Sequence, residues 1–366
     1  MKNIILFKRI IVTVGLIAVT GFFLVITFGG QNTPSVAKSK VSSPKTKEQK
    51  VVSGKIDEMI KEMTKENNNL EKIESPDQKN PANKKLPNKK LVKKVPSNFK
   101  KKWSYDGAVV ANNLPIANVS QIPSGILVEP ETGKILWSKL SNKPMEIASM
   151  TKMMTSLIVL EEIEKGEISF DDVIHVSKAA SRIGGSQVYL DPKEHFTLEE
   201  LLKTIMISSA NDSSYLVAEK IGGGNVQVFV KRMNEKAKEL GMNSTQFYNP
   251  HGLPEKGDRD NKSSAYDMAI LACELLKYPV AMKWASTWTD DFRDGKFKLV
   301  NHNKLVKTLD GVDGMKTGYY RKAGFCVTIT AKRNGRRFVG VIIGSKTKKL
   351  RNGFAAKLLD WGYRPQ

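Results

Sequence analysis

The 366-residue sequence has little cysteine and histidine, with two and four copies respectively. Cys273 and Cys326 both lie in apolar surroundings, which favour buried thiols over a disulfide or a nucleophile. The histidines are scattered along the chain and show no HExxH-like spacing. The sequence therefore predicts no metal site and no cofactor.

Aromatic residues are also scarce, at 8%, whereas the formal net charge is +22. Whether such a basic chain binds nucleic acid depends on where the charge lies. Residues 31–102 contain 19 lysines and 8 acidic residues, so this stretch alone carries a net charge of +11. Its lysines are not interleaved with aromatic side chains on which bases could stack. We predict a solvated basic tether and no nucleic-acid partner, and keep a polyanion-binding role of this stretch as an alternative.

An apolar, uncharged run over residues 10–28 follows three basic residues near the N-terminus. A helix that spans a membrane needs about 20 such residues. The positive charge before the run places the N-terminus in the cytoplasm and residues 31–366 outside it. We expect residues 1–30 to be a signal-anchor that attaches the protein to the cytoplasmic membrane, or a signal peptide if they are cleaved and the protein is secreted.

Residues 31–102 repeat Lys, Asn, Ser and Pro and contain few large apolar side chains, so they cannot offset the entropy lost on ordering. The sequence predicts a disordered, lysine-rich linker here. Its charge would attract anionic lipid or an anionic wall polymer. Residues 103–366 are rich enough in apolar side chains to form one catalytic domain.

The predicted elements of residues 103–366 indicate an α+β domain. The β-rich segments come in two pairs, each joined by a short turn: 125–129 with 133–138, and 325–332 with 336–344. Helices are expected at about 148–165, 198–207 and 350–361. Because strands at both ends enclose a helical middle, we expect a single antiparallel sheet formed from both ends of the domain, with a helical subdomain.

A Ser-x-x-Lys pattern, Ser149 and Lys152, opens the first of these helices. Residues three apart on a helix face the same side, so the lysine amine can reach the serine hydroxyl. A neutral lysine there can act as the general base that activates a serine nucleophile. Backbone N–H groups at the helix start suit an oxyanion. The pattern recurs elsewhere in this lysine-rich chain, but only this copy opens a strongly apolar helix.

Two further triplets are Ser-Ala-Asn at 209–211 and Lys-Thr-Gly at 316–318. Each alone is typical of an ordinary turn or loop. The three patterns in this order form the motif set of β-lactamases and penicillin-binding proteins. Three more segments complete the pattern: Asn-Pro-His-Gly-Leu-Pro at 249–254, Ser-Ala-Tyr-Asp-Met-Ala at 264–269 and Ala-Gly-Phe-Cys at 323–326. The Lys-Thr-Gly triplet itself belongs to a longer segment, Asp-Gly-Met-Lys-Thr-Gly-Tyr at 313–319. Residues 104–363 thus resemble the low-molecular-mass D-alanyl-D-alanine carboxypeptidases of the serine peptidase S11 family, which have a β-lactamase/transpeptidase-like fold.

The resemblance implies a serine-type carboxypeptidase of cell wall biogenesis and cell shape, which removes the terminal D-alanine from peptidoglycan stem peptides. Ser149 would attack the carbonyl between the two D-alanines while Lys152 takes its proton. Ser209 would relay protons, and Asn211 would hold the substrate amide. The ammonium of Lys316 would lie close to Lys152 and lower the pKa of that lysine.

The resemblance also implies how the end of the substrate is bound. Lys316 and Thr317 would bind the terminal carboxylate of the peptide, and Arg351 would assist them. Backbone N–H groups of Ser149 and Tyr319 would form the oxyanion hole. β-Lactam antibiotics would act as inhibitors by acylating the same serine.

Some residues depart from the family pattern or receive no chemical role. Tyr266 stands where some relatives carry arginine, which removes one expected carboxylate contact. The sequence ends at Gln366, shortly after its last expected helix, so we expect membrane attachment through the N-terminal segment. His251 is interpreted as a turn residue, and Asp212 is expected to support its loop.

Two alternatives to the carboxypeptidase remain. The first is a β-lactamase or esterase on the same fold, which needs an efficient deacylating base. The glutamates after the first motif, Glu161, Glu162 and Glu164, show no clear candidate for that base. The second is a catalytically inert wall-binding protein, against which the presence of all three motifs argues.

Overall fold

The structure of the protein, a computed structural model, describes residues 93–364 apart from residues 101 and 256. The predicted signal-anchor, residues 1–30, and the linker up to residue 92 lie outside the described residues. Among the helices that are described, none is long and apolar enough to cross a membrane.

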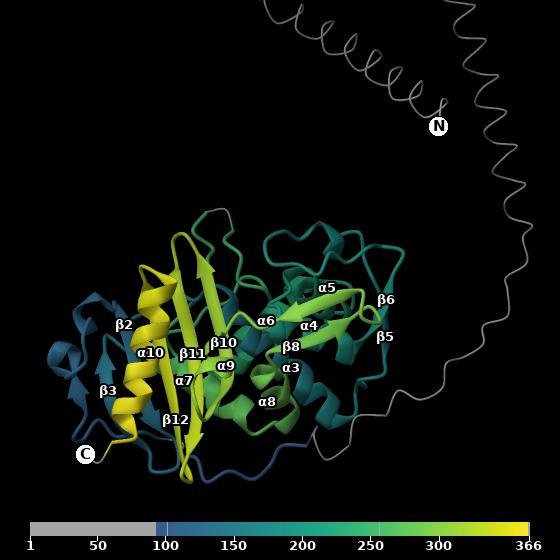
Figure 1. Ribbon diagram of the computed structural model, residues 1–366. Helices are drawn as coiled ribbons and strands as arrows, with labels where there is room; N and C mark the ends of the chain where they lie inside the picture. The colour runs from purple at the N-terminus through teal and green to yellow at the C-terminus, as the bar shows by residue number, and fades with distance from the viewer. Residues whose placement is uncertain (1–92, 101, 256, 365–366) are drawn as a thin grey trace, which may run out of the picture. The chain divides into compact units, whose positions relative to one another are not determined.

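A six-stranded sheet combines segments from both ends of the described chain (Figure 1). Its strands in spatial order are β1 (Val109–Val110), β3 (Lys134–Lys139), β2 (Ser124–Glu129), β12 (Arg336–Ser345), β11 (Gly324–Arg333) and β10 (Val312–Tyr320). Neighbours are antiparallel except β1, which pairs with β3 in parallel. The prediction of a sheet from both ends is confirmed, and the prediction that it is wholly antiparallel is wrong at β1. This strand is connected to β2 by two short 3₁₀ turns and not by a hairpin, so no tight turn fixes its direction.

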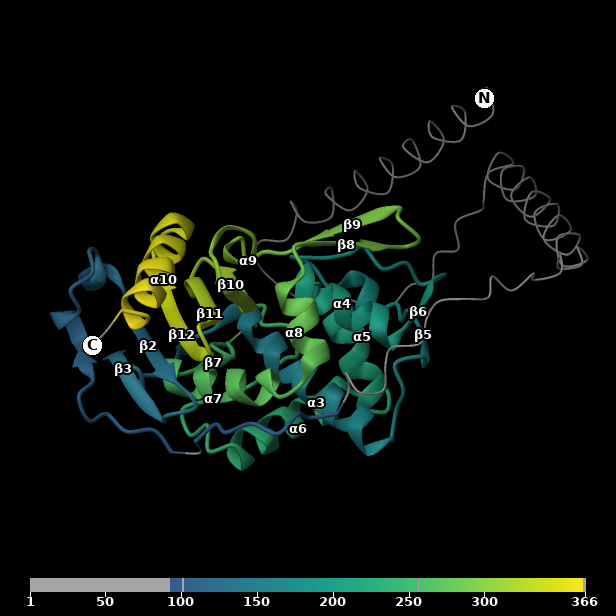
Figure 2. The same cartoon turned by 60° about the horizontal axis from the view of Figure 1, so that its bottom comes forward.

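Side chains of the central strand β2 alternate between two cores, as the period of two in a strand requires. Ile126 and Val128 belong to the core that contains helix α7 (Ala265–Leu276), whereas Leu127 packs in the core under helix α10 (Lys348–Gly362). The two helices therefore cover opposite faces of the sheet (Figures 1 and 2). This double cover explains why the strand is buried along its whole length.

The predicted hairpin near the end of the chain connects β11 to β12. Asn334 and Gly335 have φ angles of 48° and 79°, the left-handed conformation that a two-residue turn of this type needs at both positions. Arg333 and Arg336 pair directly across the turn. The Asn-Gly pair therefore fixes the register of the two longest strands.

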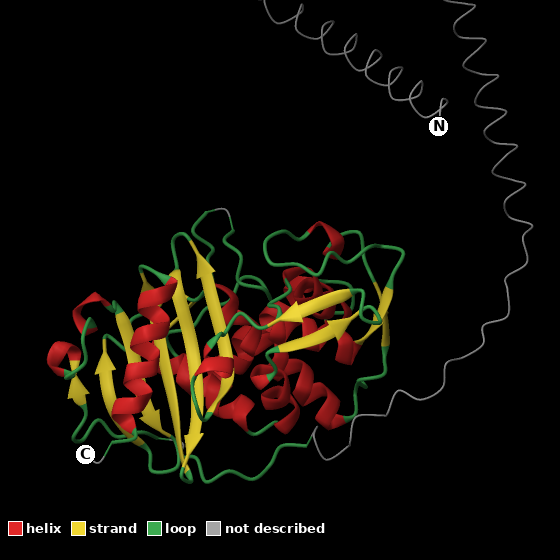
Figure 3. Cartoon of the chain, in the orientation of Figure 1, coloured by secondary structure: helices red, strands yellow, loops and turns green. Residues whose placement is uncertain are grey.

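The chain between β3 and β10 forms the helical part of the domain, beside the sheet in Figure 3. Its helices are α3 (Lys152–Lys165), α4 (Leu198–Ile207), α5 (Asn211–Ile221), α6 (Val226–Glu239), α7, α8 (Pro279–Ser286) and α9 (Leu305–Thr308). Three two-stranded sheets accompany them: β4 (Met145–Glu146) with β7 (Lys262–Ser263), β5 (Val173–His175) with β6 (His195–Thr197), and the hairpin of β8 (Thr289–Phe292) with β9 (Phe297–Val300). The helix expected from residue 148 begins with a 3₁₀ turn, η4 (Ala148–Thr151), and becomes α-helical only at Lys152.

Residues 93–100 pack against the folded domain. The backbone N–H of Val95 donates to the carbonyl of Lys277 at 2.7 Å, and that of Lys100 donates to Pro130 at 2.9 Å. Lys94 forms an ion pair with Glu161 at 3.2 Å, and Phe99 packs on the main core. Carboxylates and apolar surface of the domain thus hold residues that precede the expected start of the domain at residue 103.

Candidate active site

Ser149 and Lys152 meet at the junction of η4 and α3. Ser149 lies in the 3₁₀ turn, and the buried side chain of Lys152 begins the α-helix. Lys152 Nζ donates to Ser149 Oγ at 3.0 Å, to Asn211 Oδ1 at 2.6 Å and to the carbonyl oxygen of His251 at 2.6 Å. The three-residue spacing thus brings amine and hydroxyl into hydrogen-bond contact, as expected from the sequence.

The protonation of Lys152 is shifted toward the neutral amine. Burial lowers the pKa of Lys152 well below its ordinary value of 10.5, and the positive charge of Lys316 lowers it further. The carboxylate of Asp212 acts in the opposite direction. A neutral amine that contacts a serine hydroxyl can accept its proton, so the pair has the geometry of a base and a nucleophile.

The second motif lies between α4 and α5. Ser209 has a left-handed backbone, with φ at 61°, and Asn211 is the first residue of α5. Asn211 Oδ1 accepts from Lys152, while Nδ2 donates to the carbonyl of Gly184 at 2.7 Å. Both ends of this buried amide are therefore occupied, which fixes its orientation toward the lysine.

The third motif comes from β10. Lys316 is buried, and its Nζ donates to Ser209 Oγ at 2.8 Å and to the carbonyl of Thr317 at 3.1 Å. Burial, assisted by the charge of Arg351, lowers the pKa of Lys316 to about 7. Near neutral pH this group can therefore both hold and release a proton next to Ser209.

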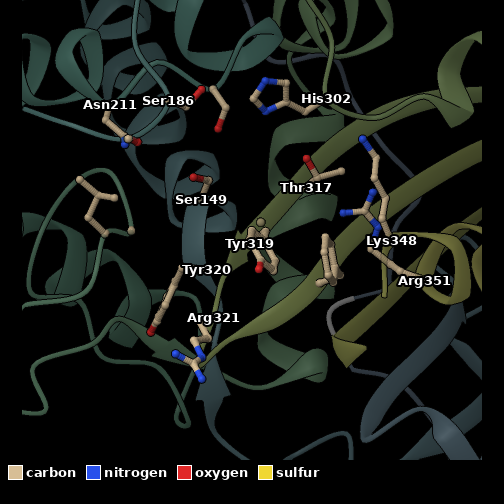
Figure 4. Close-up of a pocket in the computed structure, with 16 residues that line it drawn as sticks. Ser149, Ser186, Asn211, His302, Thr317, Tyr319, Tyr320, Arg321, Lys348 and Arg351 are labelled. Atoms are coloured by element: carbon tan, nitrogen blue, oxygen red, sulfur yellow. The ribbon is translucent and has the colours of Figure 1, made fainter. Parts of the chain in front are cut away.

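A cleft of about 650 Å³ lies above these groups (Figure 4). Six of the eight candidate residues line it: Ser149, Ser209, Asn211, Thr317, Tyr319 and Arg351. The other two, Lys152 and Lys316, are buried and reach the serine hydroxyls from the protein interior. The structure therefore brings all eight together from α3, α5, β10, α10 and the turns between them.

The strand β10 forms one wall of the cleft and is an edge strand of the six-stranded sheet. A Cβ at Gly318 would lie 2.5 Å from the carbonyl oxygen of Ile147 and 3.1 Å from the backbone nitrogen of Ser149. On the other side, a Cβ at Gly252 would lie 2.0 Å from the carbonyl oxygen of Ala148. The peptide that leads into Ser149 is thus held between two glycines, which brings its N–H next to the edge of β10.

Arg351 extends from α10 to the end of the cleft near Thr317 and Lys348 (Figure 4). Its Nη1 donates to the carbonyl of Cys326 at 3.1 Å, and Nε and Nη2 donate to Asn352 Oδ1. Burial lowers the pKa of Arg351 to about 10, so the guanidinium remains charged at neutral pH. A hydroxyl and two cations at one end of a cleft suit a carboxylate.

Two structural expectations from the sequence agree with the contacts. The Asp212 carboxylate accepts from the backbone N–H groups of Val188 and Leu190, at 3.1 and 3.2 Å, and so supports the loop over the cleft. Burial lowers the pKa of His251 to about 3, and its Nδ1 accepts from the N–H of Leu253 at 3.1 Å. The carbonyl contact of His251 with Lys152 was not expected, because backbone groups leave no sequence signal.

His302 was not predicted from the sequence; it lies in the loop between β9 and α9 and lines the cleft. It is exposed at the rim, yet the cleft lowers the pKa of His302 to about 4, through desolvation and then through the charges of Lys316 and Lys152. No motif surrounds it that could have indicated this position. Tyr266, in contrast, packs edge-to-face against Trp103, stacks on Tyr105 and is not among the cleft-lining residues.

Comparison with known proteins matches residues 115–347 to the D-alanyl-D-alanine carboxypeptidase family, peptidase S11. D-alanyl-D-alanine carboxypeptidase DacF of Bacillus subtilis is 47% identical over 243 residues, which cover 66% of this chain and 61% of that protein. DacC of Escherichia coli is 32% identical over 246 residues, 65% of this chain and 60% of the relative. The matched segment thus spans about three fifths of both relatives.

Solved structures agree with these matches. The carboxypeptidase DacD from Francisella tularensis superposes with a TM-score of 0.62 at 30% identity, covering 69% of this chain and 72% of that one. Penicillin-binding protein D2 from Listeria monocytogenes, in its ampicillin-bound form, gives 0.61 at 28% identity, covering 67% and 98%. The predicted α+β fold of penicillin-binding proteins is therefore confirmed.

Proposed function

The chain belongs to the D-alanyl-D-alanine carboxypeptidase family, peptidase S11, and on this premise we propose that it removes the terminal D-alanine from peptidoglycan stem peptides. One observation carries the proposal: the amine of Lys152, whose pKa is lowered by burial, lies 3.0 Å from Ser149 Oγ. A neutral amine at this distance can remove the hydroxyl proton and make the serine a nucleophile.

In the proposed first step, Ser149 Oγ forms a bond to the carbonyl carbon between the two D-alanines, and Lys152 takes the hydroxyl proton. The N–H groups of Ser149 and Tyr319 stabilise the negative oxygen that results. The C–N bond then breaks, and the leaving amine takes a proton through Ser209, whose Oγ accepts from Lys316 at 2.8 Å. Water hydrolyses the ester in the second step, which restores the serine and frees the shortened peptide.

We propose that the substrate lies along the free edge of β10, as an added strand. Its terminal carboxylate would reach Thr317, Lys316 and Arg351, and the amide before the scissile bond would reach Asn211. These groups hold the reacting carbonyl next to Ser149, and such positioning supplies a large part of a rate enhancement.

The same serine is proposed to react with β-lactams. The Listeria relative is described in complexes with ampicillin and with cefotaxime, and both structures share this fold. A β-lactam has an amide, which ring strain makes reactive, and a carboxylate. A peptide that ends in D-alanine also offers Ser149 an amide and a carboxylate. The acyl group would remain bound because its leaving group cannot diffuse away.

The β-lactamase alternative would require a base that deacylates the enzyme quickly. None of the three glutamates on α3 is among the residues that line the cleft. Each has another partner: Lys94 binds Glu161, Arg232 binds Glu162 and Tyr278 binds Glu164. This arrangement supports slow release of a penicilloyl group.

The location of the protein is a separate proposal. We propose that residues 1–30 attach it to the cytoplasmic membrane and that residues 31–366 lie outside the cytoplasm, where peptidoglycan is found. The apolar run at residues 10–28 and the basic residues before it support this. We also propose that the lysine-rich linker contacts anionic lipid or wall polymer. Membrane fractionation and protease treatment of intact cells test the orientation, and a protease-resistant domain would contradict it.

The test of the activity measures free D-alanine released from a pentapeptide ending in D-Ala-D-Ala, by the full-length protein and by its Ser149→Ala variant. We expect release by the parent and none by the variant, and labelling by fluorescent penicillin only in the parent. Penicillin labelling without D-alanine release would contradict the carboxypeptidase and favour the β-lactamase or esterase. Neither reaction in a folded parent would favour an inert wall-binding protein.

A further inference from the structure

Besides Arg351 and Lys348, the cleft has a further cationic group, Arg321, at the end away from Arg351 (Figure 4). Arg321 follows β10 directly and is exposed. Within the described part of the chain it forms no hydrogen bond, ion pair or ring contact. The nucleophile, Ser149, lines the same cleft as the two arginines.

The neighbouring lysine shows that Arg321 is an exception at this turn. Lys322 Nζ lies 2.6 Å from Asp260, 3.0 Å from Asp258 and 3.2 Å from Glu146. These carboxylates are thus engaged by one ammonium, while the adjacent guanidinium has no acidic partner. An unpaired planar cation at a cleft is suited to bind a carboxylate supplied by a ligand.

The direction of the substrate decides which part of it reaches Arg321. If the terminal carboxylate lies at Thr317 and Arg351, the earlier residues of the peptide must run along β10 toward Tyr320. A strand advances about 3.3 Å per residue, so Arg321 lies about 13 Å along from Thr317. The third and second residues of a pentapeptide, with their side chains, reach this distance from the terminal carboxylate.

Between the two ends lies an aromatic platform. Tyr319 is 56% exposed, and its ring stacks on Phe325 with centroids 4.1 Å apart. Both residues line the cleft. The platform can carry the aliphatic part of a long side chain whose charged end reaches Arg321.

We propose that Arg321 forms a subsite for a second carboxylate of the stem peptide, two or three residues ahead of the terminal D-alanine. This inference rests on the proposed function, because it uses the direction of the peptide. It deepens that function by naming the substrate class: stem peptides that keep a free acid at their second or third residue. Peptides in which that acid is amidated, or absent as in a lysine side chain, are weaker substrates.

The test compares pentapeptides that differ in one group. In the first pair, the third residue is a diamino-diacid whose side-chain carboxylate is either free or amidated. In the second pair, the second residue is linked to the third through its side-chain carboxyl, and its α-carboxylate is either free or amidated. Parent, Arg321→Gln and Arg259→Gln proteins are assayed for D-alanine release at low salt. Arg259 is a matched control, because it is exposed on the adjacent loop and is not among the residues that line the cleft.

We expect the parent to prefer one free acid over its amide by about fivefold in kcat/KM, the upper range for an exposed ion pair. Arg321→Gln reduces this ratio to about one, and Arg259→Gln keeps it. The peptide pair in which the parent prefers the acid and Arg321→Gln does not identifies the residue, second or third, whose carboxylate binds Arg321. Equal rates for acid and amide in the parent, or an unchanged ratio in Arg321→Gln, would overturn the subsite.

A binding measurement separates this proposal from the proposed activity. Dissociation constants of the acid and amide peptides are measured by calorimetry for two proteins, Ser149→Ala and the double variant Ser149→Ala with Arg321→Gln. The measurement does not require either protein to hydrolyse the peptide. The same preference is expected in the first protein only, and it should fall with added salt. If binding shows the preference while the parent releases no D-alanine, the subsite stands and the carboxypeptidase does not. Equal binding of both peptides would refute the subsite whatever the activity.

Discussion

Replacing Gly252 by alanine is expected to displace the nucleophile without touching its side chain. Gly252 has a φ of 86°, and a Cβ there would lie 2.0 Å from the carbonyl oxygen and 2.4 Å from the carbonyl carbon of Ala148, and 2.9 Å from the nitrogen of Ser149. All three atoms belong to the backbone, so no rotamer change can relieve the contact. The peptide that carries the Ser149 N–H must move.

The expected loss of stability has two parts. The left-handed backbone costs a residue with a Cβ about 1–2 kcal/mol, and overpacking against fixed atoms adds about 1–3 kcal/mol. Gly252→Ala should thus lower the free energy of unfolding by about 2–5 kcal/mol. The matched control is Gly223→Ala, with a φ of 65° and no atom within 4 Å of the added Cβ, which should lose only the first part.

Two assays check this prediction: urea unfolding, and the rate of acylation by a fluorescent penicillin. Because a displacement of about 1 Å near reacting atoms can cost about 100-fold in rate, Gly252→Ala should acylate about 100-fold more slowly than the parent. Gly223→Ala should acylate at the parent rate. If Gly252→Ala matched the control in both assays, the close approach to Ala148 would not be what holds Ser149.

Three other predictions concern buried charged groups. Because the pKa of Lys316 falls from 10.5 to about 7 on folding, the unfolded chain binds more protons between these values, and stability should rise with pH across that window. Lys316→Met should remove the part of this rise that Lys316 contributes in urea unfolding, leaving the part that comes from buried Lys152, and should also abolish D-alanine release. Since Lys152 must be neutral to act as a base, penicillin acylation should increase with pH and level off above the lowered pKa of Lys152, in a stopped-flow profile. Asp212→Asn should weaken two charge-assisted bonds from Val188 and Leu190, lower the free energy of unfolding by about 1–3 kcal/mol and increase hydrogen exchange at both amides.

The local parts of the fold and site could be predicted from the sequence. The contact between Ser149 and Lys152 follows from helical spacing alone, and the turn at Asn334 and Gly335 follows from the conformations these residues adopt. The helix over residues 198–207 also has the predicted bounds, since Thr197 and Glu200 form a capping box at its start. Short-range geometry determines each of these features.

The long-range parts could not be derived in this way. Lys316 bonds to Ser209 across 107 residues, and only the resemblance to a family indicated that the two would meet. His302 and Arg321 line the cleft without any motif, because their positions depend on how whole segments pack. The docking of residues 93–100 was missed for the same reason: composition describes the segment, but it does not show that Glu161 and Glu274 lie where they can pair with Lys94.

The order of the strands also determines when the cleft can form during synthesis. Val128 of β2 pairs with Val339 of β12, so the centre of the sheet joins segments from opposite ends of the domain. Contacts between such distant segments are slow to form and require the intervening chain to be complete. A growing polypeptide that already contains Ser149 and Lys152 still lacks β10, β11 and β12, and therefore the wall of the cleft. Ser149 is therefore synthesised well before the strands that complete its cleft, so an unfinished chain has no complete site.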